Sequence, residues 1–128
     1  MITVYLVDDT LETRQVLANL VHYAGGKVVG MAANGPDALR DLELHPADLV
    51  ITDFQMPEMT GVALARALVH RDPAQAVALV TVLDDPRLDR TAKAAGVRYV
   101  LPKPVTLAAM EELLRQIRPR PEARFRWE

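Results

Sequence analysis

The sequence alternates between short apolar runs and segments with helical spacing, and the alternation repeats five times within 128 residues. The apolar runs are rich in Val, Ile and Leu, and they cover residues 2–7, 27–33, 48–52, 76–81 and 98–101. Most are apolar on both faces, which is typical of strands in a parallel sheet covered on two sides. This repeat predicts an α/β fold in which right-handed crossovers place helices on both faces of a five-stranded parallel sheet.

Turn and capping residues separate the runs where this fold requires the chain to reverse. Gly25-Gly26 predicts the end of the first helix. Asp85 predicts the N-cap of the fourth helix, with Pro86 at its first position, and Thr106 predicts the N-cap of the fifth. These turn and capping residues therefore agree with five strand–helix units.

Composition limits the class of protein. Half of the residues are hydrophobic and a quarter are charged, which is typical of one globular domain. The formal net charge of −2 gives no support for binding to nucleic acid or to an acidic membrane surface. The absence of cysteine excludes disulfides and thiolate metal sites, and no apolar run is long enough to span a bilayer. We expect a cytoplasmic protein.

The C-terminal stretch "RPRPEARFRWE" departs from the repeat. Its prolines disfavour a continuing helix. We therefore expect one domain over residues 1–118 and a tail or linker over residues 119–128.

Polar residues follow four of the predicted strands at the ends where ligands bind in open α/β sheets. These residues are Asp8 and Asp9 after the first strand, Asp53 after the third, Thr81 at the end of the fourth and Lys103 after the fifth. Each has an ordinary explanation alone, such as a helix cap, a turn or a solvent-exposed lysine. Their coincidence at one edge of the sheet instead predicts a functional site.

Clustered carboxylates without His or Cys favour a hard divalent cation such as Mg²⁺, which takes one or two carboxylates and a phosphate oxygen. We expect Asp8 and Asp9 to hold this ion. Asp53 is the central acid in sheet order and could act as a nucleophile toward phosphorus, forming an aspartyl-phosphate. Lys103 would neutralise phosphoryl oxygens, and the Thr81 hydroxyl would donate to another.

These motifs resemble the receiver domain of bacterial two-component response regulators. The resemblance covers residues 2 to about 118 and includes "DD" at 8–9, "DFQMPEMTG" at 53–61, Thr81, and "KP" at 103–104. It implies a flavodoxin-like, doubly wound sheet in the order 2-1-3-4-5 with five helices. The Lys103–Pro104 peptide bond is often cis in such proteins.

The resemblance also implies roles for the site residues. Asp53 would accept a phosphoryl group, and Lys103 would pair with it. Mg²⁺ would be bound by Asp9, Asp53 and the main-chain carbonyl of Gln55, with Asp8 acting mainly through water.

The partners implied by the resemblance are a sensor histidine kinase or phosphotransfer protein and an unknown downstream protein. No nucleic acid or membrane partner is expected. Many relatives pair through the face of the fourth helix, fifth strand and fifth helix, so a homodimer through that face is an additional possibility. Such a domain catalyses only its own phosphorylation and dephosphorylation, and we do not expect a metabolic enzyme.

Three positions depart from the family pattern. Val82 follows Thr81 where a small residue is common, and we expect it to crowd the phosphate pocket. Val100 occupies the place of the usual aromatic residue, and Tyr99, one residue earlier, should face the other side of its strand. Leu83 could shield the phosphate from water.

Two other functions fit parts of this pattern. The departures at Val82 and Val100 support a receiver-like interaction module with weak or no dependence on phosphorylation. A haloacid-dehalogenase-type phosphatase also forms an aspartyl-phosphate, but it needs an acid where this chain has Thr10, so that function is discarded.

Overall fold

Strands and helices alternate without interruption in the computed structural model, which describes residues 1–121. The elements are β1 (Thr3–Val7), α1 (Leu11–Tyr23), β2 (Lys27–Ala32), α2 (Gly35–Leu44), β3 (Leu49–Asp53), α3 (Gly61–Arg71), β4 (Ala76–Thr81), α4 (Pro86–Ala94), β5 (Tyr99–Pro102) and α5 (Leu107–Arg115). The predicted N-caps are confirmed, because the side chains of Asp85 and Thr106 accept hydrogen bonds from the first turns of α4 and α5.

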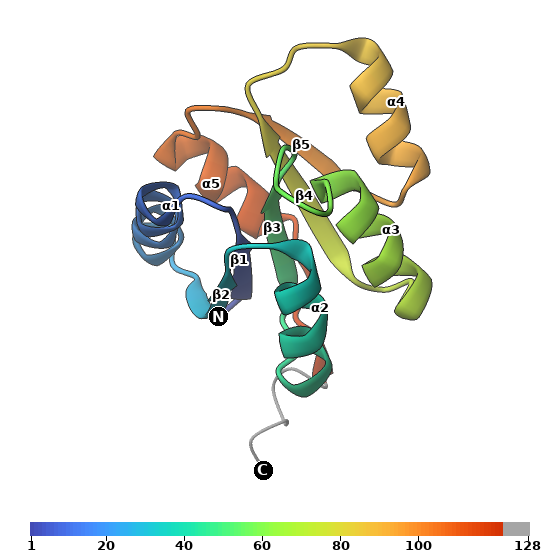
Figure 1. Cartoon of the computed structure of the whole chain (residues 1–128). Helices are drawn as coiled ribbons and strands as arrows, with labels where there is room; N and C mark the ends of the chain where they lie inside the picture. Colours follow the sequence, from blue (N-terminus) through green and yellow to red (C-terminus); the bar gives the residue numbers. More distant parts are fainter. Residues whose placement is uncertain (122–128) are drawn as a thin grey trace.

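The five strands form one parallel sheet in the order β2-β1-β3-β4-β5. Figure 1 shows α1 and α5 on one face of the sheet and α2, α3 and α4 on the other. This confirms the predicted flavodoxin-like, doubly wound fold.

Alternate residues of the central strands pack into two separate cores. On β1, Val4 and Leu6 face the core under α1 and α5, whereas Tyr5 and Val7 face the core under α2, α3 and α4. The same alternation holds along β3 and β4, which are fully buried except at Asp53. The central strands are therefore held on both sides, so that the residues at their ends sit on a rigid base.

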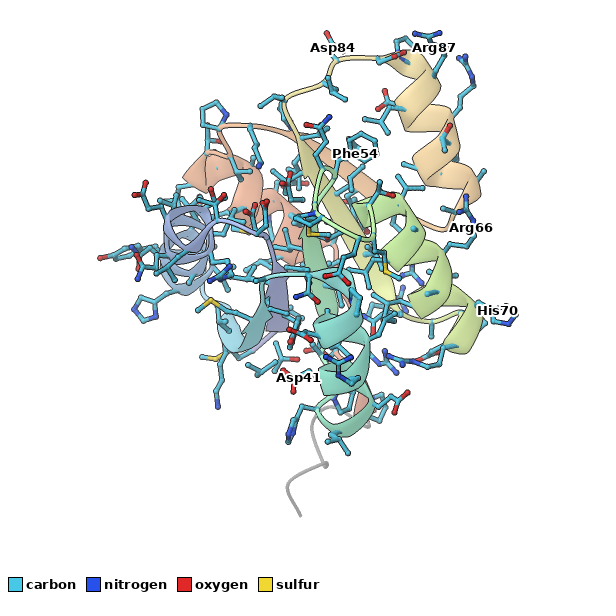
Figure 2. The ribbon with its side chains drawn as sticks, in the orientation of Figure 1. Asp41, Phe54, Arg66, His70, Asp84 and Arg87 are labelled. Atoms are coloured by element: carbon cyan, nitrogen blue, oxygen red, sulfur yellow. The ribbon has the colours of Figure 1, made fainter. Side chains whose placement is uncertain are left out.

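The helices that cover these cores keep their charged groups at the surface. Arg66 and His70 point away from the sheet on the outer side of α3 (Figure 2). Tyr5 is buried between β1 and α2, and its hydroxyl donates a 2.7 Å hydrogen bond to Asp41 on α2. Burial, together with the nearby Asp41 carboxylate, raises the pKa of Tyr5 far above its usual value, so the hydroxyl stays protonated.

Predicted and observed strand limits differ by one residue at the functional edge. β3 extends to Asp53, which pairs with Val80 in the register of β3 and β4. β5 extends to Pro102, because Lys103 N donates to the Thr81 carbonyl at 2.9 Å and continues the ladder. These extensions set Asp53 and Lys103 closer to the sheet than the sequence pattern indicated.

A buried polar network closes the opposite, amino-terminal edge of the sheet. Asp48 is 1% exposed, and its two carboxylate oxygens accept hydrogen bonds from Thr3 N at 2.8 Å and Arg120 N at 2.6 Å. The Arg120 guanidinium donates to Gln75 Oε1 at 2.7 Å and pairs with Asp72. The network ties the starts of three strands to the segment after α5.

Arg120 lies within the predicted tail, just beyond the expected domain limit. Its contacts show that packed structure continues past residue 118 to at least this residue. Residues 122–128 of the predicted tail lie outside the described residues. The division at residue 118 stays a prediction.

We expect Asp48→Ala to lower the free energy of unfolding by roughly 1–3 kcal/mol, because Thr3 N and Arg120 N lose their acceptor. Urea denaturation would measure the change. Asp84→Ala, at an exposed position, is the matched control and should shift stability by less than about 0.5 kcal/mol. Equal effects of the two substitutions would contradict the network's role.

Candidate functional site

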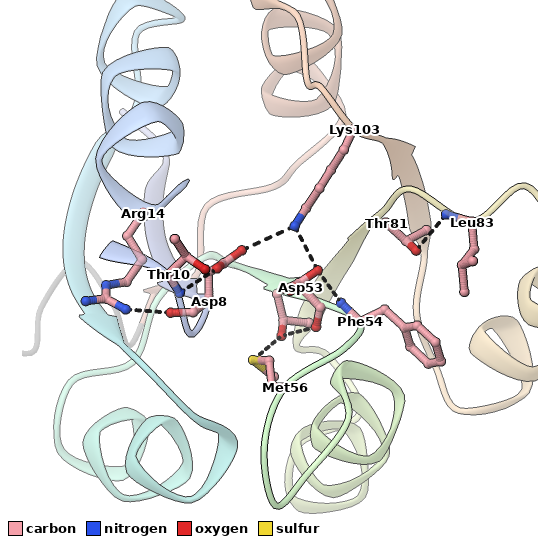
Figure 3. Close-up of polar contacts among 10 residues, drawn as sticks. Asp8, Thr10, Arg14, Asp53, Phe54, Met56, Thr81, Leu83 and Lys103 are labelled. Atoms are coloured by element: carbon pink, nitrogen blue, oxygen red, sulfur yellow. Dashed lines mark hydrogen bonds and ion pairs between the residues drawn. The ribbon is translucent and has the colours of Figure 1, made fainter. Parts of the chain in front are cut away.

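Strand register brings the predicted site residues to one edge of the sheet. Val7 pairs with Thr52, so Asp8 and Asp53 emerge side by side from neighbouring strands. Thr81 pairs with Pro102, so Lys103 follows at the same level. Figure 3 shows these side chains gathered above the strand ends.

The three acids form one cluster. Asp8, Asp9 and Asp53 each offer a carboxylate oxygen, and these oxygens all lie within 4.8 Å of one another. Asp8 is buried, Asp53 is half-buried and Asp9 is exposed, so the cluster opens to solvent on one side. So much like charge in a small volume is unfavourable unless cations balance it.

Asp8 is the most enclosed of the acids. Its Oδ1 accepts a hydrogen bond from Thr10 N at 2.9 Å, whereas its buried Oδ2 has no hydrogen-bond donor among the described residues. Burial raises the pKa of this carboxyl; the Thr10 hydrogen bond and the Lys103 charge oppose the rise, while the charges of Asp53 and Asp9 add to it. Folding therefore disfavours the charged form of Asp8.

Lys103 is the one basic side chain that the described ion pairs place between these acids (Figure 3). Its Nζ lies 3.0 Å from Asp53 Oδ1 and 3.5 Å from Asp8 Oδ2, the second distance being long for a hydrogen bond. Burial alone would lower the pKa of Lys103, but the hydrogen bond and charge of Asp53, together with Asp8, outweigh it and raise the pKa. The ammonium therefore stays charged and balances part of the cluster.

The backbone after β3 fixes the Asp53 carboxylate. Phe54 N donates to Asp53 Oδ1 at 2.9 Å, and Gly61 N donates to the Phe54 carbonyl at 2.8 Å, which folds the loop back over the strand. A Cβ at Gly61 would lie 2.2 Å from the Asp53 carbonyl oxygen and 2.7 Å from Leu79 Cδ1. Only glycine fits this approach, so the return of the loop depends on Gly61.

Thr81 is buried at the end of β4, and its hydroxyl is already engaged. Leu83 N donates to Thr81 Oγ1 at 3.1 Å, and among residues 1–121 no hydrogen bond joins Thr81 to Asp53. The hydroxyl hydrogen remains available for an acceptor. Thr81 therefore lies at the site, but among the described residues its hydroxyl makes no hydrogen bond to the acids.

The donor set fits a hard divalent cation. All three donors are carboxylates, and Asp8 Oδ2 is a buried oxygen without a hydrogen bond that a cation would satisfy. Gln55 is exposed in the loop after β3, and the use of its main-chain carbonyl as a ligand stays a prediction.

Two residues of the site were not found from the sequence. Arg14 Nη1 donates to the Asp8 carbonyl at 2.6 Å, and the buried Thr52 hydroxyl donates to the Asp53 carbonyl at 3.0 Å. One signal for Arg14 was present in the sequence, because a cation is disfavoured near the start of a helix unless another interaction holds it there. Thr52 gave no signal beyond its preference for strands.

A family model for the response regulator receiver domain matches residues 4–115. The chain belongs to this family. Among curated relatives, the transcriptional regulatory protein CitT of Bacillus subtilis is 32% identical over 117 residues, which cover 91% of this chain and 52% of CitT. The probable chemotaxis protein CheY of Rhizobium etli is 30% identical over 119 residues, which cover 91% of this chain and 92% of that protein.

Solved structures of receiver proteins share the fold. The chemotaxis protein CheY4 of Vibrio cholerae superposes with a TM-score of 0.84 and 28% sequence identity, covering 92% of this chain and 99% of CheY4. The chain thus spans nearly all of the chemotaxis proteins but about half the length of CitT. Receiver domains are signalling domains, and the expectation that this chain is not a metabolic enzyme agrees with the family.

The departures from the receiver pattern lie at the surface of the β4 and β5 ends. Tyr99 packs against the core under α1 and α5, whereas Val100 is 37% exposed and lines a groove beside α4 with Lys93. The two side chains thus lie on opposite faces of β5, as expected. Val82 is 73% exposed and lines a separate groove with Lys103, so its expected crowding of the phosphate pocket stays a prediction.

We expect Gly61→Ala to lower the free energy of unfolding by roughly 1–3 kcal/mol, because the added methyl group would overlap the Asp53 carbonyl and force the backbone to move. Thermal unfolding would measure the change. Gly25→Ala is the comparison: φ there is +91° but a Cβ would meet nothing within 4 Å, so its cost, roughly 1–2 kcal/mol, reflects backbone conformation alone. A smaller loss for Gly61→Ala than for Gly25→Ala would show that the loop can relax.

We expect Asp8→Asn to stabilise the protein at neutral pH in the presence of EDTA, by on the order of 1 kcal/mol or about 4 °C in midpoint. A carboxyl whose pKa is raised by folding destabilises the folded state above that pKa, and this cost disappears as the pH falls through it. The gain should therefore shrink on acidification, because wild-type Asp8 then becomes neutral. Scanning calorimetry at several pH values would test this, and a gain that persists at acid pH would contradict it.

Proposed function

We propose that this receiver domain is a phosphorylation-dependent signalling switch in which Asp53 accepts a phosphoryl group from a sensor histidine kinase or phosphotransfer protein. The observation that carries the proposal is the Lys103 ammonium held between Asp53 and Asp8 beside an open acidic cluster. A half-buried carboxylate with a cationic charge 3.0 Å away is suited to receive an anionic group that needs neutralising.

The transfer itself is a nucleophilic displacement. A carboxylate oxygen of Asp53 attacks the phosphorus, the bond from phosphorus to the donor nitrogen breaks, and an acyl phosphate forms. Lys103 loses part of its contact with the carboxylate and gains the phosphoryl oxygens. The Phe54 N–H keeps the Asp53 side chain aligned during this exchange.

Mg²⁺ would be held by Asp8, Asp9 and Asp53, with the Gln55 carbonyl as a further predicted ligand. When bound, it neutralises the carboxylates and the phosphoryl oxygens, so that two anions can approach each other. Asp8 is suited to hold the ion directly or through water, because its Oδ2 is buried without a hydrogen bond.

Thr81 provides the route from chemistry to signal. Its hydroxyl now accepts from Leu83 N, and its own hydrogen can turn toward a phosphoryl oxygen at Asp53. That movement would release or rebuild the loop after β4 and shift the population of its conformations. Partner proteins would then bind the surface formed by this loop and α4.

The downstream partner is a protein of unknown identity, and a homodimer through α4, β5 and α5 stays a prediction. The separation of Tyr99 from Val100 on β5 supports our expectation that Tyr99 does not take the usual aromatic switching role. The shielding of the phosphate by Leu83 also stays a prediction.

We place the domain in the cytoplasm on the basis of its family and its lack of cysteine. In the part of the chain that the structure describes, every helix is too short or too polar to cross a bilayer. A receiver domain at residues 1–118, followed by a tail or linker at 119–128, remains our proposed organisation.

The alternative, an interaction module independent of phosphate, is not favoured. Such a module would not need three carboxylates and a lysine gathered at one edge, because their mutual repulsion and desolvation cost stability. The retained geometry instead supports phosphoryl acceptance.

We expect a small phosphodonor to add the mass of one phosphoryl group to the wild-type protein in the presence of Mg²⁺, and not in EDTA. Asp53→Ala should abolish this label, because it removes the acceptor oxygen. Intact mass measurement would follow the reaction. Glu43→Ala, which removes an exposed acid on α2, is the matched control and should label like the wild type.

Label that persists in Asp53→Ala would identify another acceptor and refute Asp53. A wild-type protein that stays unlabelled with both a small donor and a phosphorylated histidine phosphotransfer domain would favour the interaction module.

A further inference from the structure

Arg14 makes a contact at the site that the proposed phosphoryl transfer does not use. It is half-buried on α1, and its Nη1 donates a 2.6 Å hydrogen bond to the main-chain carbonyl of Asp8 (Figure 3). Hydrogen bonds from a charged donor at such a distance are among the strong ones. The contact therefore restrains the backbone of Asp8.

Asp8 is fixed at three points, of which Arg14 supplies one. Its N–H donates to the Ala32 carbonyl at 3.1 Å, and its Oδ1 accepts from Thr10 N at 2.9 Å. Arg14 holds the carbonyl, which lies beyond the last paired residue of β1. With these three groups held, Oδ2 is left facing the acidic cluster.

The carbonyl held by Arg14 belongs to the peptide unit that joins Asp8 to Asp9. The torsion ψ of Asp8 sets both the orientation of this carbonyl and the direction in which the chain continues to Asp9, so a hydrogen bond that fixes the carbonyl also limits where the Asp9 carboxylate can lie. Arg14 therefore restrains two candidate ligands with one hydrogen bond. A restrained ligand pair binds an ion with less loss of conformational freedom.

The place of Arg14 on α1 points to a specific role. It is the fourth residue of the helix, where the positive end of the helix dipole disfavours a cation. The hydrogen bond to the Asp8 carbonyl is the interaction that holds it there, so Arg14 acts on the acids through the backbone.

We propose that Arg14 is a positioning residue for the divalent cation, holding the Asp8–Asp9 peptide so that both carboxylates face Asp53. This inference rests on the proposed function, because it concerns the same cation. It goes beyond that function because it makes the affinity of the carboxylates for the ion depend on a side chain that is not itself a ligand.

The test is the Mg²⁺ affinity of purified protein, measured by isothermal titration calorimetry without any phosphodonor. Arg14→Met keeps the length of the side chain but removes the donors, and should raise the dissociation constant about ten-fold, as loss of a ligand-supporting hydrogen bond does. Arg14→Lys retains one donor group, and its dissociation constant should lie between those of the wild type and Arg14→Met. The magnesium concentration that half-saturates labelling should rise in the same order.

Arg66→Met is the matched control, because Arg66 is exposed on the outer side of α3 (Figure 2). It should bind Mg²⁺ like the wild type. Thermal unfolding in EDTA identifies the variants that fold, and Arg14→Lys carries the test if Arg14→Met does not fold.

Mg²⁺ affinity within two-fold of the wild type in a folded Arg14 variant would overturn the inference, even if its thermal midpoint falls. That result would leave the proposed function intact, provided that the wild type binds Mg²⁺ and labels at Asp53. Failure of the wild type to bind Mg²⁺ or to label would instead refute the proposed function itself.

Discussion

Charge balance at the carboxyl edge of the sheet determines what this domain can bind there. Three carboxylates lie within 4.8 Å of one another, and the ammonium of Lys103 is held between two of them. Burial raises the pKa of Asp8, and the charges of Asp53 and Asp9 add to the rise, so the charged form of this carboxyl is disfavoured. A site in this condition favours any cation or cationic arrangement that completes it, which is what an ion-assisted phosphoryl acceptor requires.

The rest of the fold holds this unfavourable cluster in place. Central strands buried on both faces fix the ends from which the acids project. At the other edge, Asp48 joins the starts of the strands to Arg120 beyond α5. The stability of the cores therefore offsets the repulsion that the site stores, a common arrangement at functional sites.

The architecture and most of the site could be predicted from the sequence. Repeated doubly apolar runs identify a parallel sheet, and the fixed geometry of such sheets brings Asp8, Asp53, Thr81 and Lys103 to one edge. The hydrogen bonds that aim these side chains could not be predicted in the same way. The hydrogen bond from Arg14 to the Asp8 carbonyl depends on the rotation of α1 about its own axis. The hydrogen bond from Arg120 N to Asp48 depends on the path of the chain after α5, where the sequence has no periodic pattern.

The docking of Arg120 has a practical meaning for anyone who extends the chain. Arg120 is bound to Asp48 at the amino-terminal edge of the sheet, and Asp53 lies at the carboxyl edge, about 17 Å away along the five-residue strand β3. A fluorescent reporter or affinity handle joined directly after residue 121 would therefore start on the far side of the sheet from the acidic crevice and would leave its mouth clear.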